Sequence, residues 1–395
     1  MLDILLLLLL LLLIASITRE ESVFTLFYLV AGATIIGRWW SHRALKAVSF
    51  KRTFSRRAFL AEIVPVRLEI ANPGWLPVVW LHLQDNLPLE LAGPNSFRQA
   101  ISLGPHARVQ LDYQLQADKR GYYPVGPLFL RSGDLLGSVT DGPNWEGAPD
   151  HLTVYPKIVP LTRLSLPSWS PLGTLRHTQP IFEDPSRVLS KRSYVAGDSL
   201  RRIDWKASAA TSQLQVKQFE PSIALETAVC LNLNADEYGA HTRIDSTELA
   251  IVIAASIASW LVNQKQSVGL ITNGADPIQS EGHVTKLPPR KGRGNLMRIL
   301  DVLARIQMTE TGPLAQLLHQ QIVHLAWGAT LIVITGQLDE PLLRALFQAR
   351  RAGLNALIIL VGFGAELGEM ERRAKYFGFA VYHIRTERDL DMWRH

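Results

Sequence analysis

The sequence predicts a multidomain α+β protein with three structured parts: an N-terminal transmembrane helical hairpin, a β-sandwich-like domain and a C-terminal doubly wound α/β domain. Three changes of pattern along the 395 residues support this fold class. The chain opens with two apolar runs, continues with short stretches of alternating apolar and polar residues, and ends with aliphatic strands that alternate with helical segments. We place these parts at 1–40, 41–160 and 223–395, with a linker and a distinctive basic segment over 161–222.

Two apolar runs near the N-terminus predict membrane helices. The first, Ile4–Ile17, is short, because it covers roughly 21 Å of a hydrocarbon core about 30 Å thick. The second, Val23–Trp40, ends in an arginine and a pair of tryptophans, as is typical of a membrane interface. We expect a hairpin whose acidic turn is Thr18–Ser22. A cleaved signal peptide and a re-entrant first segment are alternatives; an acidic Asp3 and the lack of a small-x-small cleavage site speak against the former.

Charge predicts the orientation of this hairpin. Residues 38–57 contain seven Lys or Arg and no acid, which by the positive-inside rule places both chain ends and all later domains in the cytoplasm. The stretch either contacts anionic lipid or acts only as a topology signal. The single cysteine, Cys230, excludes an internal disulfide framework and fits a reducing compartment. The expected location is therefore the plasma membrane, with two membrane passes.

The middle of the chain predicts a β domain. From about Phe50 to Tyr155, apolar and polar residues alternate with a period of two, and Asn-Pro-Gly, Arg-Gly and Gly-Pro turns interrupt them. Short alternating strands with such turns are typical of a small β-sandwich. No cluster in this part has a catalytic pattern, and its aromatic residues are expected in the core or in turns.

The last third predicts a sheet of parallel strands covered by helices on both faces, because continuous aliphatic strands alternate with helical segments after Glu226. In such folds ligands bind at the carboxyl ends of the strands. No phosphate-binding loop, His-Glu-x-x-His, Cys-x-x-Cys or Gly-x-Ser-x-Gly motif is present. The glycines of 362–368 have the wrong spacing for a dinucleotide fingerprint and fit a helix start. A further alternative is a hydrolase whose Ser, His and Asp come together only on folding, and no sequence motif supports it.

The segment RSYVAGDSLRRIDWKAS, from Arg192 to Ser208, combines basic residues with one Gly-Asp turn and one Trp. We expect Gly197 to form the turn, Asp198 or Ser199 to cap a short helix that runs through Ser208, and Trp205 to be buried against the α/β unit. The basic residues either pair with nearby acids and solvate a surface, or form a docking patch for an acidic partner. The candidate partner-binding residues are Arg192, Tyr194, Gly197, Asp198, Arg201, Arg202, Asp204, Trp205 and Lys206.

This segment resembles the central signature of the bacterial domain of unknown function 58 family, which reads Arg-x-Tyr-x-x-Gly-Asp, then Arg-x-Ile-x-Trp-Lys-x-Ser-Ala, then a strand that ends in Phe-Glu. Further similarity lies in KRGYYPVGPLFLRSGDLLG, although its Asp134–Gly137 turn lacks the family's proline, in LTVYPKIVPL and in RKGRGNLMRILDVLARI. The two N-terminal membrane helices also fit the family, so the resemblance covers essentially the whole chain. The matching residues are Arg192, Tyr194, Gly197, Asp198, Arg201 or Arg202, Ile203, Trp205, Lys206, Ser208, Ala209, Phe219 and Glu220.

The resemblance implies that the C-terminal unit is similar to a von Willebrand factor A domain, a class that often binds a divalent cation through Asp, Ser and Thr oxygens. This chain departs from that pattern, because its first loop reads Asn-Ala-Asp-Glu-Tyr and its later loop lacks Asp. The expected state is metal-free and without a cofactor. The positions of the degenerate site are Asn234, Asp236, Tyr238, Thr311 (or Thr309 in its place) and Gly336.

These features predict a membrane-anchored, non-enzymatic interaction or scaffold protein of the bacterial inner membrane. The resemblance adds an expected partner, a MoxR-type AAA+ ATPase, and a role in envelope-related assembly or stress. A divalent-metal-dependent ligand-binding A domain is the alternative. Basic residues are dispersed or close to the membrane and no nucleic-acid-binding motif occurs, so nucleic acid is not an expected partner. The sequence does not fix the oligomeric state.

Overall fold

A computed structural model describes residues 2–91, 97–133, 139–141, 150–164, 183–195, 203–221, 226–278, 284–310, 312–363 and 365–394. The chain forms two compact units, one of Met1–Lys157 with Leu303–Arg305 and one of Ile158–Val302 with Ile306–His395. The elements are mixed helices and strands, preceded by apolar helices, which confirms the mixed α/β class.

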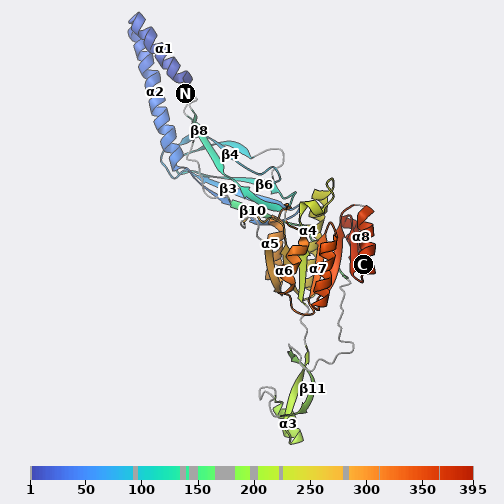
Figure 1. The fold of residues 1–395 in the computed structure, drawn as a ribbon. Helices are drawn as coiled ribbons and strands as arrows, with labels where there is room; N and C mark the ends of the chain where they lie inside the picture. The colour runs from blue at the N-terminus through green and yellow to red at the C-terminus, as the bar shows by residue number, and fades with distance from the viewer. Residues whose placement is uncertain are drawn as a thin grey trace. The chain divides into compact units, whose positions relative to one another are not determined.

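The first unit begins with two apolar helices, α1 (Leu2–Thr18) and α2 (Glu21–Ala47), which lie side by side in Figure 1. Their apolar side chains face outward: Leu9 is 64% exposed and Ile35 70%. Apolar surface of this extent indicates an interaction with lipid or protein. By length and composition α2 is able to cross a bilayer, whereas α1 is shorter. The predicted apolar N-terminal helices are therefore present.

Helix α2 continues past Trp40, where the predicted hairpin ends. Its last turns carry Ala44 and Leu45, each 2% exposed, and the next residue, Val48, is also buried. All three pack in a core with Leu68, Leu81 and other residues of the strands that follow. The helix is thus joined to the β domain by shared core packing as well as by the chain.

The β domain contains three sheets, whose strand orders are β1-β3-β6, β5-β4-β8-β9 and β2-β10-β7. The neighbours are antiparallel except β2 and β10, which are parallel. The strands are β1 (Ser49–Thr53), β2 (Arg57–Phe59), β3 (Ile63–Ala71), β4 (Val78–Asp85), β5 (Arg98–Leu103), β6 (Arg108–Gln116), β7 (Gly121–Val125), β8 (Leu128–Gly133), β9 (Val139–Asp141) and β10 (Asp150–Tyr155).

Two apolar cores hold these sheets together. Along β3 every second side chain is buried, because strand side chains alternate between faces. Leu68 and Ile70 pack with residues of β4, β5, β6 and β8, whereas Val64 and Val66 of the same strand pack with residues of β2, β6, β7 and β10. The two cores therefore occupy successive parts of one buried layer.

The second unit contains a six-stranded sheet of order β15-β14-β13-β16-β17-β18. All neighbours are parallel except β14 and β15. Its strands are β13 (Glu226–Leu231), β14 (Ser267–Thr272), β15 (Thr285–Arg290), β16 (Thr330–Thr335), β17 (Asn355–Val361) and β18 (Ala380–Ile384). Its helices are η3 (Ala235–Glu237), α4 (Arg243–Asn263), α5 (Arg293–Arg305), α6 (Leu314–Ile322), α7 (Glu340–Arg351), α8 (Ala365–Tyr376) and η4 (Glu387–Trp393).

The central strands of this sheet are buried on both faces, as their continuous aliphatic sequence predicts. Helices α6 and α7 pack on the face that carries Cys230 and Val333. Helix α4 contacts four of the strands and is itself buried, so it is a core helix although it is long and apolar enough to span a membrane.

Strand β15 departs from the predicted all-parallel sheet. It runs antiparallel to β14 at the edge, and its sequence, Thr-Lys-Leu-Pro-Pro-Arg, contains two prolines. Proline has no N–H to donate to a neighbouring strand, so it argues against a strand when the sequence alone is considered. At the edge of a sheet this N–H is not needed, and proline is tolerated there.

Candidate functional site

The predicted partner-binding segment forms a hairpin module. Strand β11 (Glu183–Ser193) pairs antiparallel with β12 (Gln215–Pro221), and helix α3 (Trp205–Thr211) lies between them in the chain. Tyr194 N–H donates to the Leu214 carbonyl at 2.8 Å, and Asp204 N–H donates to the Gln215 carbonyl at 2.8 Å. These two bonds bring the end of β11 and the start of α3 to the start of β12.

Asp204 fixes the start of α3. Its Oδ1 accepts from the Ala207 backbone N–H at 3.2 Å, and its Oδ2 lies 2.9 Å from Lys191 Nζ on β11. The hydrogen bond from Lys191, aided by the one from Ala207, lowers the pKa of this carboxyl group. Ser208 accepts from the Gln215 N–H through its hydroxyl, which joins the helix to β12. The helix is therefore locked to the hairpin by its N-cap.

Two predictions for this segment are wrong. The cap of the helix is Asp204, because the helix begins at Trp205, well after Asp198 and Ser199. Trp205 is 68% exposed, whereas we expected it to be buried. The helix side chains one turn later are Ser208 and Ala209, which are too small to cover an indole ring. The candidates Gly197, Asp198, Arg201 and Arg202 lie outside the described residues.

The remaining candidates lie on this one module, and exposed apolar side chains accompany them. Val195 is 61% exposed and Leu214 44%, and both belong to the segments that the two backbone bonds join. We call Val195, Trp205 and Leu214, with the exposed Lys206, the hairpin patch. Arg192 is half-buried and donates to the Ser193 carbonyl at 3.2 Å, and Tyr194 is also half-buried.

A second polar cluster lies at the carboxyl ends of β13, β14 and β16. Because the chain leaves β13 toward β14 on one side and later enters β16 on its other side, this is a topological switch point, where ligands bind in open α/β sheets. Asn232 follows β13 directly and is fully buried. Its amide Nδ2 donates to Glu237 Oε2 at 2.5 Å and to Thr335 Oγ1 at 2.9 Å, and its Oδ1 accepts from Asn273 Nδ2 at 2.9 Å.

Glu237 is the acid of this cluster. Its second carboxylate oxygen accepts from Asn234 Nδ2 at 3.1 Å. Burial raises the pKa of Glu237, and the hydrogen bonds from Asn234 and Asn232 offset part of this rise. Tyr238 donates its hydroxyl to the Asn232 carbonyl at 2.7 Å, and burial raises the pKa of this phenol. The carboxylate is thus already engaged by amide donors of its own chain.

The predicted positions of the degenerate metal site meet here only in part. Asn234 and Tyr238 belong to the cluster, while Asp236 contributes its backbone N–H to Asn234 Oδ1 at 3.5 Å. A Cβ on Gly336 would lie 2.5 Å from the Glu237 carbonyl, so this glycine makes the loop's close approach possible. Thr309 contributes backbone bonds to Leu233 and Ala235. Thr311 lies outside the described residues.

Asn232, Asn273 and Thr335 were not among the site residues predicted from the sequence. Their type gave no signal, because asparagine and threonine also occur at ordinary strand ends; only the switch-point position could have selected them. Hard cations prefer several carboxylates, and this cluster holds one, already hydrogen-bonded. In the part of the chain that the structure describes, no three His, Cys, Asp or Glu side chains gather as metal ligands would.

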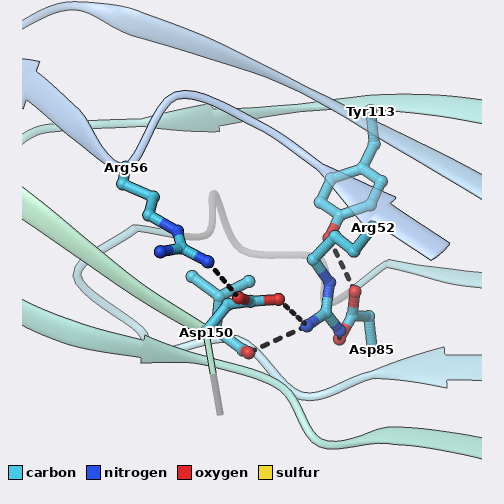
Figure 2. Close-up of polar contacts among 6 residues, drawn as sticks. Arg52, Arg56, Asp85, Tyr113 and Asp150 are labelled. Atoms are coloured by element: carbon cyan, nitrogen blue, oxygen red, sulfur yellow. Dashed lines mark hydrogen bonds and ion pairs between the residues drawn. The ribbon is translucent and has the colours of Figure 1, made fainter.

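A third cluster, which the sequence did not reveal, lies inside the β domain. Figure 2 shows the Arg52 guanidinium between Asp85 and Asp150, with the Tyr113 hydroxyl directed at Asp85. Arg52 Nη2 lies 2.6 Å from Asp85 Oδ1, Tyr113 donates to Asp85 Oδ2 at 2.6 Å, and the two ion-pair side chains are 5% and 0% exposed. Arg52 also donates to the Val125 carbonyl at 2.9 Å.

This network links β1, β4, β6 and β10, the four strands that carry its members. Arg52 belongs to the basic stretch expected to lie beside the membrane, but its charge is buried and paired. Exposed Arg56, 79% exposed at its side chain, reaches the outer member Asp150 at 3.5 Å. Burial and the neighbouring Asp85 raise the pKa of Tyr113, so this phenol remains a donor. We therefore assign this network a structural role in stabilising the β domain.

Comparison with known proteins supports the resemblance seen in the sequence. Residues 190–361 match the model of the family described as "Protein of unknown function DUF58", the family whose signature the sequence resembles. The match begins within β11 and ends with β17, so it contains the hairpin patch and the switch-point cluster.

Relatives and solved structures are more distant. The chain is 25% identical to the uncharacterized protein YeaD of Bacillus subtilis over 273 residues, 68% of this chain and 64% of that protein. It is 29% identical to the uncharacterized protein Rv1480 of Mycobacterium tuberculosis over 122 residues, 31% of this chain and 36% of that protein. The chain thus spans less than two thirds of the length of these relatives.

Among solved structures, the CARDB domain of the PF1109 protein from Pyrococcus furiosus aligns with 27% of this chain and 86% of that chain, at 14% identity and a TM-score of 0.21. The C-terminal domain of wzt aligns with 28% of this chain and 75% of that chain, at 9% identity and the same TM-score.

Proposed function

We propose that the protein is a membrane-anchored, non-enzymatic interaction protein that holds a protein partner through the hairpin patch. The observation that carries this proposal is Trp205, a large aromatic side chain 68% exposed at the start of a helix that Asp204 locks in place. Tryptophan is among the residues that contribute most to protein interfaces when a partner covers it. Rigid presentation lowers the entropy that binding costs.

The charge of the module supports an acidic partner. Six Lys or Arg and two acids occur over residues 190–218, so the region has a clear basic excess. One pair, Lys191 with Asp204, is internal, whereas Lys206 is exposed next to Trp205. Basic side chains around an aromatic anchor raise the association rate with an acidic surface. The family resemblance suggests a MoxR-type AAA+ ATPase as this partner, in envelope-related assembly or stress.

The anchor in this proposal is the hairpin of α1 and α2. Helix α2 spans 27 residues, about 40 Å at the α-helical rise, which exceeds a hydrocarbon core of about 30 Å. The basic excess that follows its apolar run supports an inner-membrane protein with two passes and cytoplasmic domains. Arg52 contributes less to this signal than the sequence suggests, since it is buried.

The switch-point cluster supports a binding role without chemistry. Its single carboxylate accepts bonds from Asn232 and Asn234, so it is engaged before any ligand arrives. We also extend the family resemblance to a von Willebrand factor A-like α/β domain, which the strand order and the antiparallel edge strand support. The second candidate is a divalent-metal-dependent ligand-binding A domain, and the observation behind it is that Asn, Thr and Glu side chains meet at the switch point.

Pull-down from detergent-solubilised membranes of the source cells tests the first proposal. The baits are the native chain, Trp205→Ala with Lys206→Glu, and Tyr376→Ala as a matched control, because Tyr376 is 87% exposed and lies outside the hairpin module. We expect the ATPase with the native and control baits and its loss with the double variant. Equal recovery by all three baits, or recovery of no ATPase, would contradict the proposal.

A further inference from the structure

We infer that the turn between β3 and β4, with Trp75 at its tip, is a second membrane contact that inserts into the head-group region of an anionic bilayer. This inference rests on the proposed anchoring by α2. The partner is the lipid surface itself, and the contact sets the β domain against the membrane.

Helix α2 and the turn between β3 and β4 belong to one packed core. Leu45 at the end of the helix is 2% exposed and packs in the same core as Leu76 of the turn, which is 3% exposed. Helix and turn therefore share one packed core, so the level of one relative to a bilayer determines the level of the other.

The turn also contacts α2 directly at the end of the apolar run. Trp40 donates from its indole Nε1 to the Pro77 carbonyl at 3.0 Å, and its ring lies 6.5 Å from that of Trp75 in an edge-to-face arrangement. Trp40 ends the first apolar run of α2, directly after Arg38 and Trp39, a position typical of the membrane interface. Trp75 lies at the same level because it touches Trp40.

The backbone of the turn is held in place while its tryptophan is exposed. Asn72 is fully buried and donates to the carbonyls of Leu76 and Gly104, at 2.8 and 3.1 Å, while its Oδ1 accepts from Gly74 N–H. This bonding holds both ends of the turn, yet the Trp75 side chain between them is 66% exposed. Tryptophan is enriched at membrane interfaces, where its ring is apolar and its N–H remains hydrated.

The charge around the turn favours an anionic surface. The turn, residues 72–77, and the adjoining turn, residues 104–107, contain no acid, and neither does the stretch 37–61. The two turns are neighbours, since His106 N–H donates to the Gly74 carbonyl at 3.2 Å. The two turns contain no Lys or Arg either, so the positive charge comes from the stretch 37–61, which includes the exposed Arg43 and Lys46 of α2. Basic residues without acids beside a membrane anchor are attracted by anionic head groups. An acidic or protein-docking surface would not require this composition.

Site-specific fluorescence in vesicles of phosphatidylethanolamine and phosphatidylglycerol tests the inference. The full chain carries one added cysteine, as Trp75→Cys, Trp39→Cys or Tyr376→Cys, labelled with a polarity-sensitive dye. Native Cys230 is fully buried, and the unmodified chain measures its background labelling. Trp39, 57% exposed on α2, reports the anchor, and Tyr376 reports a surface of the second unit.

We expect a spin label on the lipid head group to quench the dye at positions 39 and 75 by more than half, and the dye at 376 hardly at all. Quenching at 39 with none at 75 would overturn this inference and leave the anchor intact. Failure of the chain to float with the vesicles, with no quenching at 39, would overturn the anchor and this inference together.

Discussion

The amide of Asn232 donates to Glu237 across 2.5 Å, and its second hydrogen reaches Thr335 at 2.9 Å. Both amide hydrogens of a buried asparagine are therefore used within the chain. The relation places a neutral donor at the switch point, beside the Glu237 carboxylate. It makes this edge of the sheet a closed polar network, and several of the following predictions depend on it.

Glu237 makes the stability of the second unit depend on pH. Its pKa is raised in the folded state, so the stabilisation from its protonation is fully present below the unfolded value of about 4.3 and is lost as pH rises through the folded pKa. The variant Glu237→Gln lacks this titration. We expect the unfolding midpoints in urea, measured in detergent from acidic to neutral pH, to fall more for the native chain than for the variant. Parallel curves would show that this carboxyl group is not perturbed.

Divalent metal is expected to leave the native chain unchanged. A metal site saturated a hundredfold above its Kd would add about 2.7 kcal/mol to the free energy of unfolding. With one engaged carboxylate in the cluster, we expect no change of Tm on adding millimolar Mg²⁺ or on removing it with a chelator. A reproducible rise with Mg²⁺ that Glu237→Gln abolishes would favour the metal-dependent A domain instead.

Gly336 permits the contact between two loops at the switch point. A Cβ there would lie 2.5 Å from the Glu237 carbonyl oxygen and 2.4 Å from the Tyr238 ring, so Gly336→Ala is expected to destabilise the protein by about 1–3 kcal/mol. Gly368, inside α8, has nothing within 4 Å of an added Cβ. The control Gly368→Ala should therefore be neutral or stabilise by up to about 1 kcal/mol. Equal effects of the two variants on urea unfolding would contradict the packing described.

The buried ion pair of the β domain predicts a contrast between two arginines. Arg52→Met leaves Asp85 buried without its cation, which is expected to cost about 3–5 kcal/mol. Arg56→Met removes an exposed pair with Asp150 and should cost no more than about 1 kcal/mol. Hydrogen exchange of β1, β4 and β6 in the full chain measures both. Similar protection of these strands from hydrogen exchange in the two variants would contradict the structural role assigned to Arg52.

Much of the fold follows from local sequence pattern. The alternation in β3 and the aliphatic run of β13 are set by the faces these strands bury, so a period of two or a continuous run reports them directly. Strand β15 was not predicted, because its two prolines argue against a strand. The strand forms nevertheless, because an edge position tolerates proline.

The candidate sites were harder to predict from the sequence, because they depend on contacts between residues that are far apart in the chain. In the sequence, Arg52 is one of several basic residues close to the predicted membrane helices. Its ion pair with Asp85 exists only because the fold places β4 beside it. Asn232 and Thr335 are 103 residues apart and meet only in the sheet. Trp205 looked like a core residue by its type, but the N-cap at Asp204 places it on the surface. The signature segment itself was recognisable, and the family match confirmed it.

The central claim is that Trp205 anchors a protein partner, and a binding titration tests it most directly. The purified full chain in detergent is titrated with the MoxR-type ATPase of the same bacterium, for the native protein, Trp205→Ala and Tyr376→Ala. Loss of an interface anchor costs about 2 kcal/mol or more, so we predict a Kd at least about 30-fold higher for Trp205→Ala and an unchanged Kd for the control. The same Kd for all three proteins, or no binding by the native chain, would contradict the account.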